Sequence, residues 1–218
     1  MPSRTFEQWI NGIFEHPVSK PAWYWDLAAD TCVEDDETNV DYLARLFADS
    51  DRLLRRFDNA QVNQGLNLIV DCSCSDHSFS IVGGDAPWAA RRRAIRAIYD
   101  VYAKCFAKRC ADTLRNCEAE DNPLNYICFM WWDSFPAWGD PNDPSRSDEA
   151  DEYLGVMERC LSLTHHACLE GALHGLGHWH LIFPERVEPI IDRFLRERHD
   201  LRPELVAYAR SAREGAVQ

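Results

Sequence analysis

The sequence is poor in basic residues. Its 218 residues include 23 Lys and Arg against 36 Asp and Glu, which gives a formal net charge of −13 at pH 7. Binding to a phosphate backbone needs clustered Lys and Arg side chains, so this balance argues against nucleic acid as a partner. A protein or peptide partner is expected to be basic, since it would meet an acidic surface.

Long apolar runs are also missing. Glu7, Asn11 and Glu15 interrupt residues 1–17, and no later stretch has the length and apolar character needed to cross a bilayer. No signal peptide and no contact with a membrane are therefore expected, and we predict a cytoplasmic location. The nine cysteines, an odd number, are unlike the paired set of a secreted disulfide scaffold and suit buried, reduced thiols.

Several common catalytic motifs are absent as well. The chain has no Gly-x4-Gly-Lys phosphate-binding loop, no His-Glu-x2-His helix and no Gly-x-Ser-x-Gly nucleophile elbow. The cysteines give no basis for choosing a single nucleophile among them. The function must therefore be sought in patterns other than these.

Helical periodicity is what the sequence has instead. Apolar residues recur at helical spacing along nearly the whole chain, and no segment has convincing strand character. Pro87, Pro123, Pro184 and Pro203 each stand where a helix would begin, a position at which proline is tolerated. We predict an all-α fold of about ten helices in one domain, residues 1–218.

Three segments align as repeat units. When NQGLNLIVD, NYICFMWWD and EGALHGLGH are superposed, Asp71, Asp133 and His178 share a column, and polar residues stand eight positions before each of them. Each of these helices is followed by a second amphipathic one, as in a helical-repeat array. The predicted organisation is N-terminal helices in residues 1–58, repeat units at about 59–110, 121–163 and 165–198, and a C-terminal helix at 202–213.

The last of these units resembles a HEAT or armadillo repeat. Its two helices carry ALHGLGHW and PERVEPIIDRFL, separated by a short turn. The resemblance implies an α-α superhelix with a groove that serves as a non-enzymatic binding scaffold. In combining His and Glu with helical repeats, the chain is also similar to the di-iron deoxyhypusine hydroxylases. Those enzymes carry adjacent His-Glu pairs, which this chain lacks, so no catalytic residue is carried over.

The aligned polar positions and a neighbouring tryptophan define a candidate groove. On a helical wheel Glu170, His174 and His178 fall on one side of their helix, opposite its apolar side. The predicted groove residues are Asn63, Asn67, Asp71, Asn125, Trp132, Asp133, Glu170, His174 and His178.

Three glycines, Gly171, Gly175 and Gly177, flank this polar row. A glycine inside a helix costs roughly 1 kcal/mol relative to alanine. We therefore expect either close approach of a neighbouring helix or ligand, or a helix that kinks or ends here.

Two functions remain open for this groove. The first, which we prefer on the sequence, is a scaffold that binds a protein or peptide and needs no cofactor. The second is an enzyme that depends on a divalent metal. Glu170 and His178 would stand roughly 12 Å apart along the helix, too far to share an ion whose bonds are about 2.0 to 2.2 Å long. His174 and His178 are adjacent, and Asp133 on another helix is the natural third ligand.

Overall fold

The computed structural model describes residues 4–217 apart from 119–120, 138, 141–142 and 144–145, and it contains no β-strand in this part of the chain. The helices are α1 (Phe6–Phe14), α2 (Asp36–Ala48), α3 (Ser50–Leu53), α4 (Asn59–Val70), α5 (Trp88–Asp100), α6 (Ala107–Arg109), α7 (Leu124–Ser134), α8 (Ser147–Cys160), α9 (His166–His180), α10 (Pro184–Glu197) and α11 (Pro203–Arg213). A π-helix, η3 (Val101–Phe106), joins α5 to α6, and two short 3-10 helices are η1 (Trp23–Trp25) and η2 (His77–Ser80).

Counting the continuous α5, η3 and α6 as one helix leaves ten helices in the described residues, besides the two short 3-10 helices η1 and η2. The prediction of an all-α fold with about ten helices is therefore confirmed. No helix in the described part of the chain has both the length and the apolar character needed to cross a membrane.

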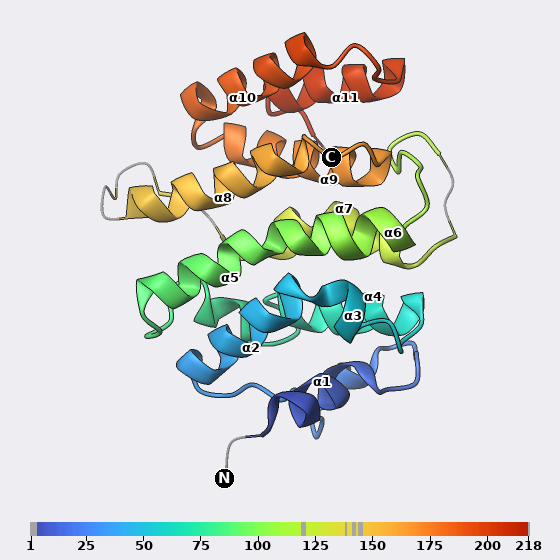
Figure 1. Ribbon diagram of the computed structural model, residues 1–218, viewed down its shortest axis with the longest axis vertical. Coiled ribbons are helices and arrows are strands. Elements are labelled where there is room, and N and C mark those ends of the chain that lie inside the picture. The colour runs from blue at the N-terminus through green and yellow to red at the C-terminus, as the bar shows by residue number, and fades with distance from the viewer. Residues whose placement is uncertain (1–3, 119–120, 138, 141–142, 144–145, 218) are drawn as a thin grey trace.

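The helices stack in two rows (Figure 1). In one row α2 packs on α5 and α5 packs on α8. In the other, contacts run from α1 to α4, α7, α9 and α11 in turn, and α10 packs against both α9 and α11. The three segments aligned by sequence lie on α4, α7 and α9, which are successive neighbours in the second row.

Local sequence explains where several helices begin. Thr5 and Asp58 each form a capping box. The side chain of the cap residue accepts the backbone N–H of the glutamine three residues later, and the side chain of that glutamine accepts the backbone N–H of the cap residue. Pro184 and Pro203 are the first residues of α10 and α11, where no hydrogen bond from the proline nitrogen is needed. These signals fix the ends of the helices, whereas their order in space comes from packing.

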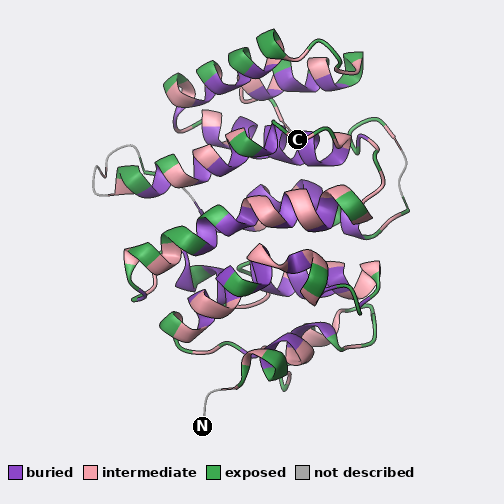
Figure 2. Ribbon diagram, in the orientation of Figure 1, coloured by how far each residue is buried: buried purple, intermediate pink, exposed green. Residues whose placement is uncertain are grey.

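The apolar core runs between the two rows (Figure 2). Trp131 lies at its centre, with ring centroids 5.6 Å from Phe47, 5.9 Å from Phe106 and 6.2 Å from Tyr102. Helix α9 is the most enclosed part of the second half of the chain, because every residue from Ala167 to Gly177 is buried. A polar residue on this helix must therefore find its partners inside the protein.

His77 is a fully buried histidine in the N-terminal half. Its Nε2 lies 2.8 Å from the Thr31 carbonyl oxygen, and its Nδ1 lies 2.8 Å from the Asn39 side-chain amide. The Asn39 amide nitrogen donates to the His77 carbonyl oxygen and to the Ser80 hydroxyl at 3.0 Å, so the amide oxygen faces Nδ1. A neutral ring can donate to only one of its two acceptors, Thr31 or Asn39. Burial lowers the pKa of His77 to about 4, and the bond to Thr31 offsets this only in part.

We expect acid to destabilise the protein through His77. An unfolded histidine takes up a proton near its ordinary pKa of 6.5, whereas the folded ring stays neutral down to about 4. The unfolded state therefore binds more protons between these values, and the free energy of unfolding falls as the pH falls through this interval, by on the order of 3 kcal/mol in full. Urea unfolding should be measured at neutral pH and at a pH midway between these two values. The fall in the free energy of unfolding between the two pH values should be smaller for His77→Gln than for the wild type. Equal losses would contradict the prediction.

Candidate metal centre

Three of the predicted groove residues meet between α7 and α9. Asp133 lies near the end of α7 and faces His174 and His178 on α9, and one ligand atom from each residue lies within 4.8 Å of the other two. His178 Nε2 is 3.1 Å from His174 Nε2 and 3.4 Å from Asp133 Oδ1. These are the same three residues that the sequence marked as the alternative metal ligands.

The separations between the ligand atoms suit a shared ion. Two atoms bonded at about 2.1 Å to one ion lie about 3.0 Å apart in octahedral geometry and about 3.4 Å apart in tetrahedral geometry. The distances from His178 Nε2 to its two neighbours fall in this range. The third separation, between the ligand atoms of His174 and Asp133, is within 4.8 Å.

His174 forms the buried end of the cluster. Its ring packs on Phe129 with the centroids 4.1 Å apart, and its Nδ1 is 2.8 Å from the Tyr208 hydroxyl on α11. Burial lowers the pKa of His174 to about 4, and the neighbouring His178 acts in the same direction. A neutral imidazole offers a lone pair, so a metal need not displace a second proton from this ring at neutral pH.

The other end of the cluster reaches solvent. The side chains of His178 and Asp133 are 26% and 37% exposed. An ion bound here would have protein on one side and water on the other. A further ligand, such as a water molecule, could approach from the open side.

Glycines on α9 explain the close approach of α7. A Cβ on Gly175 would lie 2.6 Å from Cγ of Trp132, and a Cβ on Gly171 would lie 2.4 Å from the Cys128 carbonyl oxygen. Gly177 faces the C-terminal segment instead, since its Cβ would lie 2.5 Å from the Val217 side chain. Helix α9 is unbroken over His166–His180, so the glycines serve close packing and not a kink.

Besides His174, three predicted groove residues are buried, namely Asn125, Trp132 and Glu170. The amide of Asn125 bonds both the N–H and the carbonyl of Ala111 at 2.9 Å, and the indole of Trp132 packs over Gly175. Neighbouring segments cover the helix faces that carry these residues, and their role in a groove stays a prediction.

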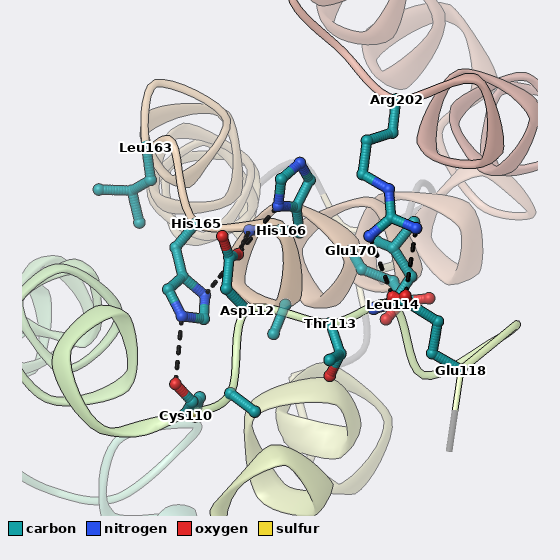
Figure 3. Close-up of polar contacts among 12 residues, drawn as sticks. Cys110, Asp112, Thr113, Leu114, Glu118, Leu163, His165, His166, Glu170 and Arg202 are labelled. Atoms are coloured by element: carbon teal, nitrogen blue, oxygen red, sulfur yellow. Dashed lines mark hydrogen bonds and ion pairs between the residues drawn. The ribbon is translucent and has the colours of Figure 1, made fainter. Parts of the chain in front are cut away.

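The loop after α6 covers Asn125 and Glu170. Carboxylate side chains connect this loop to α9 and α11 through hydrogen bonds and an ion pair (Figure 3). Glu170 accepts the backbone N–H groups of Arg115 at 2.7 Å and Asn116 at 3.0 Å. Glu118 pairs with the Arg202 guanidinium at 3.0 and 3.2 Å. Glu170 is thus an anchor for this loop and stands apart from the metal cluster.

Asp112 holds the same loop at the start of α9 (Figure 3). Its Oδ1 accepts the backbone N–H of His166 and lies 3.0 Å from the Nδ1 of that ring. These anchors could not be predicted from the sequence. The available signal was the set of acidic residues in a loop between two helices, which is also typical of a solvated loop.

The remaining groove residues lie on or next to α4. Asn67 donates to the Asn63 carbonyl at 2.8 Å and to its side-chain oxygen at 3.1 Å. Asp71 follows the last residue of α4 and accepts from the backbone and hydroxyl of Ser73. All three are half-buried and are separate from the metal cluster, so their role in a groove stays a prediction.

No family model, no curated protein and no solved structure matches the chain.

Proposed function

We propose that the protein binds a divalent transition-metal ion between α7 and α9, with Asp133, His174 and His178 as ligands. The observation that carries the proposal is the convergence of their ligand atoms from two helices, all within 4.8 Å. Two imidazole nitrogens that face each other at 3.1 Å, with a carboxylate beside them, form a region that favours a cation.

The ligand types narrow the choice of ion. Imidazole nitrogen favours zinc, copper, nickel, cobalt and iron over magnesium and calcium, which prefer oxygen. Three protein ligands leave at least one position open, as in catalytic zinc sites. An ion bound in this way acts as a Lewis acid and lowers the pKa of a bound water. The geometry therefore favours a metal-dependent enzyme, and the two stacked rows of helices support a HEAT-like scaffold for it.

Metal binding is tested by stripping the protein with a chelator and titrating it with Co²⁺ and Zn²⁺. We expect one ion per chain, visible absorption bands from bound Co²⁺, and a higher melting temperature. At 100 times the dissociation constant, the stabilisation should be about 2.7 kcal/mol. His178→Ala should weaken binding at least ~100-fold, because only two protein ligands remain.

A matched control is His180→Ala. His180 is on the same helix, but its Nε2 lies 3.3 Å from Glu188 and it is outside the cluster. This variant should bind Co²⁺ like the wild type. The proposal is wrong if the wild type binds no ion, or if both histidine variants bind equally well.

A binding scaffold for a protein or peptide partner is the second candidate, and a different observation favours it. The segment between α1 and α2 presents Leu27 fully to solvent, with Val18 and Trp25 about half exposed. Large exposed apolar side chains mark interaction sites, and Asp26 and Asp30 beside them would suit a basic partner. If the protein is a scaffold of this kind, the His178→Ala variant should still bind the partner. A variant in which both Trp25 and Leu27 are replaced by serine should no longer bind it.

A cytoplasmic location belongs to the same proposal. All nine cysteines are free thiols, five of them buried, which suits a reducing compartment.

A further inference from the structure

We infer that Tyr208, on the C-terminal helix α11, positions His174 for metal binding by fixing which ring nitrogen carries the proton. The inference rests on the proposed function. The hydroxyl of Tyr208 is 2.8 Å from His174 Nδ1, while His174 Nε2 faces His178. Tyr208 therefore contacts the ring on the side away from the ligand cluster, and it acts on the ion only through His174.

A neutral imidazole exists in two forms. One ring nitrogen carries the proton and the other carries a lone pair. A metal at Nε2 needs the lone pair there, so the proton must be on Nδ1. The Tyr208 oxygen is placed to accept a hydrogen bond from that Nδ1–H. This bond favours the form of His174 that can bind the ion.

Burial makes the contact hard to replace. His174 is 2% exposed and Tyr208 is 7% exposed, so a water molecule has little access to Nδ1. The nearest other ring is that of Phe129, which offers no acceptor oxygen. Without the hydroxyl, the Nδ1–H form would leave a buried donor unpaired, and the ring would shift toward the form with the proton on Nε2. An ion would then have to displace that proton.

The contact also makes α11 part of the site. Tyr208 lies 34 positions after His174 in the sequence, and α11 packs directly on α9. If packing of α11 favours the metal-binding form of His174, then a bound ion must in turn favour the packed position of α11. The C-terminal helix is thus expected to respond to the metal.

Tyr208→Phe is the direct test, measured by Co²⁺ titration of the full chain. We expect a dissociation constant about 10 to 100 times higher than that of the wild type, the usual effect of losing a partner of a ligand histidine. The matched control is Tyr153→Phe. Tyr153 is also a buried tyrosine, on α8, but its hydroxyl has no hydrogen-bond partner among the described residues, so its loss should leave Co²⁺ binding unchanged.

Amide hydrogen exchange provides a second measurement that does not depend on the folding of a variant. Adding Co²⁺ to the wild type should increase protection of the α11 amides, and this gain should shrink in Tyr208→Phe. Unchanged α11 protection in a metal-bound wild type would overturn the inference, as would equal Co²⁺ affinity for Tyr208→Phe and the wild type. Either result leaves the proposed metal site standing, whereas a wild type that binds no Co²⁺ removes both.

Discussion

Replacing Gly171 with alanine should lower the free energy of unfolding by about 3 kcal/mol, the upper end of the usual cost of overpacking a core. The added Cβ would lie 2.4 Å from the Cys128 carbonyl oxygen and 3.4 Å from the Tyr102 hydroxyl. The first obstacle is the backbone of α7 and cannot rotate away, so α7 and α9 must move apart. The better helix propensity of alanine, worth roughly 1 kcal/mol, is too small to compensate.

Gly155 provides the matched control for this substitution. It lies inside α8, and a Cβ built there has no neighbour within 4 Å in the part of the chain that the structure describes. Gly155→Ala should therefore stabilise the protein by up to about 1 kcal/mol. Urea unfolding followed by circular dichroism measures both variants, and the expected shifts have opposite signs. A Gly171→Ala variant as stable as the wild type would show that α7 and α9 are farther apart than described.

Replacing Glu170 with glutamine should destabilise the protein by about 2 to 4 kcal/mol. This is the combined cost of losing a hydrogen bond to a charged group and of leaving a buried N–H group without a partner. The carboxylate is buried and accepts two backbone N–H groups of the loop after α6. Burial raises the pKa of Glu170, and its bonds to Asn116 and Arg115 act against this. A glutamine keeps the shape but turns an NH2 group toward one of these donors.

An exposed glutamate is the control for Glu170→Gln. The side chain of Glu197 is 62% exposed in its contact with Arg196, so Glu197→Gln should change stability by well under about 1 kcal/mol. Hydrogen exchange should also show faster exchange at the Arg115 and Asn116 amides in Glu170→Gln only. Equal stability of the two variants, with no change in exchange, would mean that Glu170 does not hold the loop.

The helical fold could be predicted because its signals are local. Periodic apolar residues indicate helices, and residues such as Thr5, Asp58, Pro184 and Pro203 mark where they begin. The alignment that placed Asp133 and His178 in one column also depended only on short segments. It paired α7 with α9, and these two helices are neighbours in the structure.

The rest of the site depends on contacts between distant segments. A helical wheel shows which residues share a face, but it does not show what covers that face, and so the burial of Asn125 and Glu170 could not be predicted. Tyr208 was missed for a related reason. It follows Leu205 and precedes Ala209 and Ala212 in the buried stripe of α11, where a tyrosine is typical of core packing. The one usable signal was that a buried tyrosine hydroxyl usually needs a hydrogen-bond partner.

The stacking of the helices has a consequence for how the protein unfolds. The main contacts of the second row join each helix to the next, so loss of structure at one end need not disturb the other. Asp133 and His178 belong to successive helices of that row, so an ion bound to both would link α7 to α9 and no other pair of helices in the row. We expect the helices from α7 onward to melt together when the ion is bound. The segment up to α4 should melt at the same temperature with or without it.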